Sequence, residues 1–337
     1  MKNIRKIGLS ALAGSLAMFS AAQAEMSISG SAEMTYTSTE GTGAASSASQ
    51  TGNPFGMEHA INFTGSGEMD NGFTYSVNTN IAGQDMATDS NILTLDMGAM
   101  GEIGFDQGVG AYGIAALENN VPTAYEEADH NVGTVGHAID ATSSSNTNVI
   151  GYKNTFAGVG VNLRYNPSIG STANQAGATS GAGDASELSW ALTSAIPGIE
   201  GLSAAVGHAK TDFSTAATND NEEWTASINY AAGPVSIGYQ QSEVQSGTAN
   251  TSGYDVTTYG IAFNVNENMS VSYNVNNATV DKTGASAVDV DEESTGISAA
   301  YTMGSASLRV AFNEADGVNG VAADTKESTE ISLALAF

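Results

Sequence analysis

The chain has 337 residues and carries 9 Lys+Arg against 36 Asp+Glu, a formal net charge of −27 at pH 7. This acidic excess excludes nucleic acid as a partner, because phosphate contacts need basic side chains, and it favours metal cations and cationic solutes. Hydrophobic residues make up 41% of the chain and cysteine is absent. The chain is therefore expected to be ordered without disulfides, through an extensive hydrogen-bond ladder or a sizeable core.

The first 24 residues are predicted to be a signal peptide. A basic head at residues 1–6 precedes an apolar stretch at residues 7–19, and Ala22-Gln23-Ala24 is the small-x-small pattern that signal peptidase cleaves. A transmembrane anchor is the alternative, but the apolar run is shorter than the ~20 residues that a bilayer-spanning helix needs. We therefore expect residues 25–337 to form one mature, exported domain, with six basic and 36 acidic residues and a net charge of −30.

From Glu25 to Phe337 the dominant sequence pattern has a period of two. Apolar side chains alternate with small or polar ones from Met26 to Tyr36 and again from Glu330 to Phe337. Such alternation places one class of side chain on each face of a β-strand, and no later stretch is apolar enough for a membrane helix. Sixteen strands are predicted in an all-β chain, at residues 26–37, 57–67, 72–82, 91–97, 101–107, 147–155, 159–166, 185–196, 202–211, 222–231, 235–244, 254–265, 269–279, 294–303, 305–313 and 327–337.

Short and long connections alternate between these strands. Eight long connections are rich in Gly, Ser, Thr and Asp, and seven short ones alternate with them. A transmembrane antiparallel β-barrel shows this asymmetry, with short turns at one rim and longer loops at the other, whereas a soluble β-sandwich has no reason for it. The predicted fold class is therefore a transmembrane antiparallel β-barrel. The long connections span residues 38–56, 83–90, 108–146, 167–184, 212–221, 245–253, 280–293 and 314–326.

The two faces of the predicted strands differ as a membrane barrel requires. The polar face is mostly Ser, Thr, Asn, Gly and Ala, which suits a water-filled lumen. The apolar face often ends in an aromatic ring, which suits the aromatic girdles of such a barrel, and an ordinary soluble core is the alternative. These rings are Tyr36, Trp190, Trp224, Tyr230, Tyr239, Tyr273 and Tyr301.

Several segments, taken in order, resemble parts of one known family. Asn62–Gly65 and Asn71–Tyr75 look like its second-to-third-strand hairpin, and Gly101–Asp106 resembles the fifth strand, which leads into a long third loop. Gly151–Tyr165 resembles the sixth and seventh strands, and Ile331–Phe337 the C-terminal aromatic strand. On these segments the chain is similar to the general bacterial porins of Gram-negative outer membranes. The resemblance implies sixteen strands, a trimer, and a third loop folded into the lumen to form the constriction.

If residues 108–146 are that third loop, their acidic side chains line the narrowest point of the pore. There little bulk water separates a fixed charge from a passing ion. The alternative is that these acids only keep a surface loop solvated. The loop also contains His130 and His137. The candidate constriction residues are Glu118, Glu126, Glu127, Asp129 and Asp140.

The resemblance also implies a cluster of basic side chains on the wall that opposes the loop acids. Lys153 stands where the family's Tyr-basic-Asn motif places one, and Arg164 and Arg309 fall on the polar parity of their strands. The predicted strands at residues 57–67 and 91–97 depart from this pattern, because their polar faces carry no Lys or Arg. We therefore predict a thin basic cluster and a pore that prefers cations.

The densest acidic run lies in the seventh long connection, at Asp289, Asp291, Glu292 and Glu293. Alternating carboxylates supply the oxygen ligands that Ca²⁺ and Mg²⁺ prefer, and such ions would bridge the protein to anionic outer-membrane lipid. The run lacks the Gly and the terminal bidentate Glu of an EF-hand loop. A solvated acidic run is therefore the favoured interpretation and a Ca²⁺ or Mg²⁺ site the alternative.

No catalytic pattern is present. The four histidines, at positions 59, 130, 137 and 208, form no H-E-x-x-H or H-x-H motif, and no nucleophile elbow or P-loop occurs. Neither a zinc site nor an enzymatic activity is predicted, and no cofactor is expected to be required.

The predicted function is passive diffusion of small hydrophilic solutes and ions, especially cations, across the outer membrane. A homotrimer is expected, inserted by the outer-membrane assembly machinery that recognises the strand ending at Phe337. Three alternatives stay open: a substrate-specific channel, a surface structural or adhesin barrel without an open pore, and a soluble exported β-protein.

Overall fold

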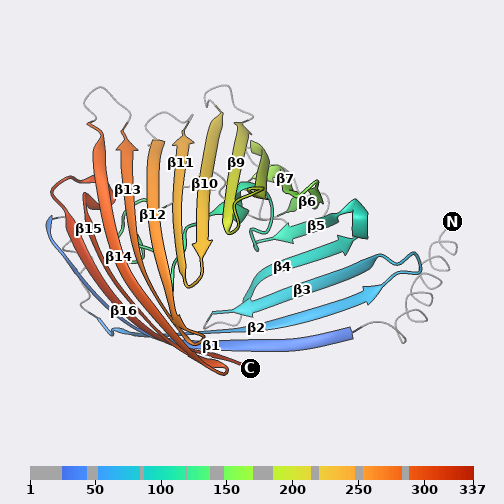
Figure 1. The fold of residues 1–337 in the computed structure, drawn as a ribbon, viewed down its shortest axis with the longest axis horizontal. Helices are drawn as coiled ribbons and strands as arrows, with labels where there is room; N and C mark the ends of the chain where they lie inside the picture. The colour runs from blue at the N-terminus through green and yellow to red at the C-terminus, as the bar shows by residue number, and fades with distance from the viewer. Residues whose placement is uncertain are drawn as a thin grey trace, which may run out of the picture.

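The computed structural model describes residues 25–43, 52–83, 87–118, 120–136, 148–169, 185–213, 220–246, 253–282 and 288–337. Each strand pairs antiparallel with its neighbours in sequence, and β1 also pairs with β16, so the sheet closes into a barrel (Figure 1). The predicted signal peptide, His137 and Asp140 lie outside the described residues. The strands are β1 (Glu25–Gly41), β2 (Phe55–Glu68), β3 (Thr74–Ala82), β4 (Ala87–Asp96), β5 (Glu102–Gln107), β6 (Val149–Phe156), β7 (Val159–Ile169), β8 (Ala185–Ala195), β9 (Leu202–Phe213), β10 (Asn221–Ala232), β11 (Val235–Gln245), β12 (Gly253–Asn266), β13 (Met269–Asp281), β14 (Val290–Met303), β15 (Ala306–Asp316) and β16 (Thr325–Ala336).

The predicted fold class, a closed antiparallel barrel of sixteen strands, is confirmed. The strand boundaries differ most at the loop ends, where β14 begins at Val290 rather than at residue 294 and β4 at Ala87 rather than at residue 91. The prediction ended each strand where polar residues took over. Backbone hydrogen bonding continues past that point, because a side chain that points outward beyond the bilayer can be polar.

Short helical turns also occur within the described ranges. They are 3₁₀ turns: η2 (Gly98–Met100), η3 (Gly113–Leu117) and η4 (Val318–Gly320). None of the helices in this part of the chain is long and apolar enough to cross a membrane.

The last residue helps to close the barrel. The Phe337 backbone N–H donates to the carbonyl of Gly30 at 2.9 Å, and the Gly30 N–H donates to the carbonyl of Phe337 at 2.7 Å. A Cβ atom on Gly30 would lie 2.4 Å from a ring carbon of Phe337. The glycine in β1 therefore leaves room for the terminal aromatic ring, and a larger residue there would force the ring to move.

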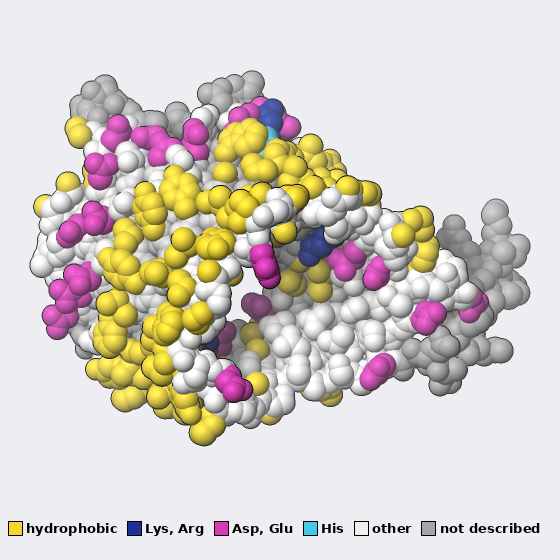
Figure 2. All heavy atoms as spheres, viewed as in Figure 1, with side chains coloured by type: hydrophobic (Ala, Val, Ile, Leu, Met, Phe, Trp, Pro, Cys, Tyr) yellow, Lys and Arg dark blue, Asp and Glu magenta, His cyan; other side chains and the backbone are white. Residues whose placement is uncertain are grey.

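The outer face of the barrel carries a band of apolar side chains. In β11 the outward residues change from Ile237 near the turn to Glu243 near the loop, and in β15 they change from Leu308 and Phe312 to Glu314. Figure 2 shows this band across the strands that face the viewer, with acidic side chains gathered toward the loop ends. An exposed apolar band of this extent indicates contact with lipid.

The inner face is polar, and the apolar clusters in the described part of the chain lie where a loop covers that face. Ile114 and Leu117 of η3 pack on Ala191 and Ala205, on the inner face of β8 and β9. Elsewhere the inward positions are mostly Ser, Thr, Asn and Gly. The long loop between β5 and β6 is thus the main element that packs inside the barrel.

Candidate pore constriction

The described part of the β5–β6 loop runs along the inner wall from β7 to β16. Its first half is held by side chains that point inward from the wall. Ser189 in β8 accepts a hydrogen bond from the Ile114 N–H at 2.7 Å, and Gln240 in β11 donates to the Leu117 carbonyl at 2.9 Å. These contacts supply partners for loop backbone groups that would otherwise be buried without them.

The second half of the loop is held in the same way. The Asn274 side chain of β13 donates to the Pro122 carbonyl at 3.0 Å, and Ser272 accepts from the Ala124 N–H at 2.9 Å. The Asn313 side chain of β15 donates to the carbonyls of Glu127 and His130 at 2.9 Å. The described part of the loop therefore crosses the lumen side of ten consecutive strands, β7 to β16, with wall contacts in both of its halves.

Tyr112 anchors the start of the loop between two glycines. A Cβ on Gly104 in β5 would lie 1.9 Å from the Tyr112 hydroxyl oxygen, and one on Gly151 in β6 would lie 2.0 Å from the ring. The hydroxyl donates to Glu102 at 2.7 Å, and the Lys153 ammonium lies 4.5 Å from the ring centroid. Burial, followed by the hydrogen bond to Glu102, raises the pKa of the Tyr112 hydroxyl, so it stays protonated and keeps this bond.

Arg164 lies on the inner face, as its parity predicted, but the loop covers it. Its guanidinium Nε is 3.2 Å from an oxygen of Glu187 in β8, and the two side chains are 1% and 0% exposed. A Cβ on Gly113 in η3 would lie 2.6 Å from the Arg164 Cβ. This buried ion pair lies between the wall and the loop that packs on it, and Arg164 presents no free charge to the lumen.

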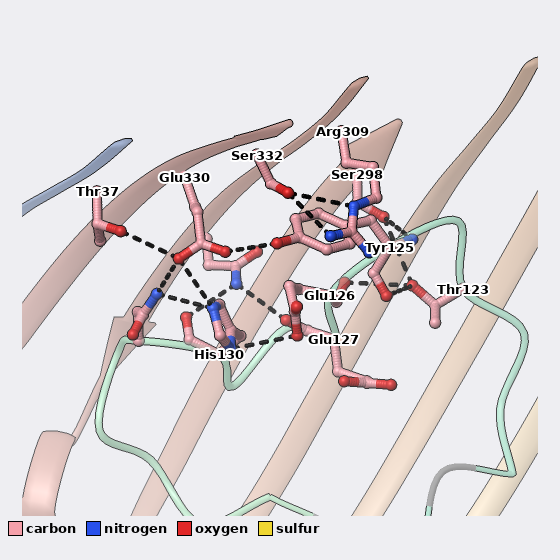
Figure 3. Close-up of polar contacts among 12 residues, drawn as sticks. Thr37, Thr123, Tyr125, Glu126, Glu127, His130, Ser298, Arg309, Glu330 and Ser332 are labelled. Carbon is pink, nitrogen blue, oxygen red and sulfur yellow. Dashed lines mark hydrogen bonds and ion pairs between the residues drawn. The ribbon is translucent and has the colours of Figure 1, made fainter. Parts of the chain in front are cut away.

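Arg309 and Tyr125 join the loop to β1, β15 and β16 (Figure 3). The Arg309 guanidinium lies 4.4 Å from the Tyr125 ring centroid and 2.6 Å from a carboxylate oxygen of Glu33 in β1. The Tyr125 hydroxyl donates to Glu330 in β16 at 2.7 Å. Ser332 donates to Glu33 at 2.5 Å and accepts from Arg309 at 2.9 Å. The charge of Arg309 is therefore matched by an inward carboxylate.

His130 lies between two carboxylates, one from the loop and one from the wall. Its Nδ1 is 3.2 Å from Glu126 and its Nε2 is 3.3 Å from Glu330. Asn131 donates to Glu330 at 2.9 Å, and Thr37 of β1 donates to it at 3.1 Å. Asn131 has a φ of 61°, a left-handed conformation that asparagine tolerates better than most residues. Glu330 thus receives contacts from both the loop and the neighbouring strand.

The loop acids sit in an environment that disfavours their charge. Burial, reinforced by the nearby negative charges of Asp129, Glu126 and Glu118, raises the pKa of Glu127 to about 7. Burial also raises the pKa of Glu126, against the lowering effect of His130. At neutral pH Glu127 is therefore close to half protonated, and the lumen charge at this level depends on pH.

Of the predicted constriction residues, the structure brings together Glu126, Glu127 and Asp129, and Glu118, an exposed residue at the end of η3, lies close enough for its charge to act on Glu127. Glu33 and Glu330, the wall acids that contact Tyr125, were not among the predicted site residues. Their positions on the polar parity of the first and last predicted strands were the available signal. The sequence does not indicate which loop residues contact Glu33 and Glu330.

The acidic run at residues 289–293 does not form one site. Asp291 and Glu293 point outward from β14, whereas Glu292 points inward and is 2% exposed. The Glu292 carboxylate accepts from the N–H groups of Val135 and Gly320 at 2.6 and 2.7 Å. The prediction placed the run in a loop, but strand alternation from Val290 onward separates the side chains, so their carboxylates do not converge on one ion.

Substituting Gly151 with valine is expected to displace Tyr112 and free the start of the loop, because no space exists for a Cβ there. The thermal unfolding midpoint of the barrel in detergent should fall, and protease should cut the loop sooner. Gly65→Ala is the matched control, since no atom lies within 4 Å of the position that a Cβ would take there. Equal midpoints and equal cleavage rates for the two variants would contradict this account of Tyr112.

Arg164→Met should destabilise the barrel by roughly 3–5 kcal/mol, because Glu187 keeps a buried charge after its partner is removed. The double variant Arg164→Met/Glu187→Leu should recover most of that loss, since no charge then remains buried. Urea unfolding in detergent measures both changes. A double variant that is no more stable than the single one would show that the loss has another origin.

Comparison with known proteins agrees with this geometry. A family model described as Gram-negative porin matches residues 8–336. No curated protein matches significantly. Among solved structures, OmpF of Salmonella typhi in complex with daunomycin has 11% identity and a TM-score of 0.71, covering 93% of this chain and 97% of that chain.

Two further structures share the fold at 12% identity, each aligned over 93% of this chain. A loop L8 deletion mutant of OmpT from Vibrio cholerae has a TM-score of 0.68 and is covered over 99% of its length. An anion-selective porin from Comamonas acidovorans has a TM-score of 0.64 and is covered over 100%. At such identities the structures show the fold alone. The family match over almost the whole sequence shows that this chain belongs to the Gram-negative porins, channel proteins of the outer membrane.

Proposed function

We propose that this porin lets small hydrophilic solutes and ions diffuse passively and that it prefers cations. The observation that carries the preference is the state of the three bases that the sequence predicted on the pore wall. Arg309 is paired with Glu33 at 2.6 Å, and Arg164 is buried against Glu187. Lys153 lies over the Tyr112 ring, beside the carboxylate that accepts the Tyr112 hydroxyl. These three bases therefore add little net positive charge to the lumen.

The wall opposite the loop carries acids and no bases. The inward positions of β2, β4 and β5 include Glu58, Asp96 and Glu102, and no Lys or Arg occurs anywhere in β2–β5. Together with Glu126, the ionised fraction of Glu127 and the wall acids Glu33 and Glu330, they make the inner surface negative. A negative surface in a narrow aqueous path lowers the energy of a cation and raises that of an anion.

Side chains rather than the fold must set this preference. The Comamonas acidovorans porin, described as anion-selective, has a similar barrel at 12% identity. Screening also limits the effect, since the Debye length is ~8 Å at physiological ionic strength. We therefore expect selectivity to weaken as salt rises.

Glu33→Gln and Arg309→Gln should shift ion selectivity in opposite directions. Glu33→Gln leaves Arg309 without its carboxylate and should reduce cation preference, whereas Arg309→Gln leaves the charge of Glu33 unneutralised and should increase it. Reversal potentials of single channels in a KCl gradient report each shift. Shifts of the same sign, or none, would show that this pair does not face the ion path.

We also propose a homotrimer formed through the outer face of β1–β3. Apolar residues on this face, such as Met34, Phe55 and Met57, extend to the loop end, where the outward side chains of β11 and β15 are acidic. One structure of Vibrio cholerae OmpT is described as a trimer form. The outward acids that the sequence suggested for Ca²⁺ or Mg²⁺, and recognition of Phe337 by assembly machinery, stay predictions.

Conductance with a series of neutral sugars separates the remaining candidates. An open diffusion pore passes small sugars and excludes larger ones by size. A substrate-specific channel would be blocked by one solute class, and a structural or adhesin barrel would not conduct. Absence of conductance from correctly folded protein would contradict the proposed diffusion function.

A further inference from the structure

We propose that Glu126, His130 and Glu330 form a binding site for Zn²⁺ that clamps the β5–β6 loop to the barrel wall. One ligand atom from each residue lies within 4.8 Å of the others. Two of the ligands come from the loop and the third from β16, so the site exists only when the loop is seated. A bound ion would join segments that are some 200 positions apart in the sequence.

The donor set favours zinc over the commoner divalent cations. One imidazole nitrogen and two carboxylate oxygens, with water in the fourth position, is a combination that Zn²⁺ accepts. Ca²⁺ and Mg²⁺ take oxygen ligands almost entirely and prefer more of them. The single histidine therefore separates the two classes of ion, and the preference is testable with Mg²⁺ as the comparison.

The spacing of the donors is close to what zinc requires. His130 nitrogens lie 3.2 Å from Glu126 and 3.3 Å from Glu330. Two ligands each about 2.1 Å from a tetrahedral ion lie roughly 3.4 Å apart. The two carboxylates approach different ring nitrogens, so the proposed site requires the Glu126 side chain to turn toward the nitrogen that Glu330 approaches. Glu126 is 26% exposed and His130 31%, so this rotation has space and ions in the lumen reach the site.

The wall ligand is already held in place by neighbouring donors. Glu330 is 9% exposed and accepts hydrogen bonds from Thr37, Tyr125 and Asn131, which come from β1 and the loop (Figure 3). Such outer contacts orient a carboxylate ligand and strengthen the metal site. They fix Glu330. The Asn131 side-chain nitrogen also lies 2.7 Å from His130 Nε2, a contact that a zinc ion bound at this nitrogen would replace.

Zinc binding would change the pore as well as hold the loop. A divalent ion at this position adds positive charge where carboxylates otherwise attract cations. It should therefore lower cation current, an effect that rests on the proposed function because it requires this part of the loop to line the ion path. Binding itself does not depend on that proposal.

Calorimetric titration of the full, folded protein in detergent at pH 7.5, after treatment with EDTA, tests the binding. Zn²⁺ should bind at one saturable site per chain, and Mg²⁺ at the same concentrations should not. His130→Asn should weaken Zn²⁺ binding at least tenfold, whereas His208→Asn should not change it, because His208 lies on the outer face, where its ring contacts Trp190 and Trp224. Equal affinity in the two histidine variants would overturn the proposal.

If His130→Asn does not fold, Glu126→Gln provides the same test, because this partly exposed loop residue can be altered without removing a wall contact. Glu126→Gln should also weaken Zn²⁺ binding at least tenfold, and an unchanged affinity for Zn²⁺ would overturn the proposed site.

Single-channel recordings distinguish the site from the proposed function. Micromolar Zn²⁺ should reduce cation current in the unmodified channel and in His208→Asn, but not in His130→Asn. Binding that is lost in His130→Asn without any effect of Zn²⁺ on current would support the metal site and contradict the placement of this loop in the ion path.

Discussion

Lipid offers no hydrogen-bond partners, so each backbone N–H and C=O group of a membrane-spanning wall must be paired within the wall. The pairing of β1 with β16, completed by the mutual hydrogen bonds of Gly30 and Phe337, meets this demand by removing both sheet edges. Closure then dictates the remaining pattern. Every second side chain points to lipid and the others point to the enclosed space, which is why a period of two runs through the chain.

The inner face of the barrel is lined by the small polar side chains that occupy every second position of the strands. Ser189, Ser272 and Asn313 are ordinary members of that pattern in sequence, yet each bonds to the backbone of the β5–β6 loop. The glycines at 104 and 151 remove side chains where the Tyr112 ring must lie. Residues of the wall therefore determine the position of the loop as much as residues of the loop do. The wall also places carboxylates beside Arg164 and Arg309.

The fold was predictable because alternation is local and needs only neighbouring residues. The inward direction of Arg164 and Arg309 followed from parity in the same way. Their environments did not, since Arg164 is covered by Gly113 and Arg309 meets Glu33 from the first strand. The first contact depends on how the loop folds onto the wall, and the second depends on barrel closure. The acidic run at 289–293 was predicted to lie in a loop, and this was wrong for a local reason, because a strand begins at Val290, earlier than the polar composition indicated.

The central claim is that a lumen with many acids, whose predicted wall bases are paired or buried, makes this porin prefer cations. The most direct measurement is the reversal potential of the unmodified channel across a tenfold KCl gradient at low ionic strength, where screening is weakest. The account predicts a potential displaced toward the equilibrium potential of K⁺, and a smaller displacement when both solutions are made more concentrated. A potential displaced toward the equilibrium potential of Cl⁻ would contradict it.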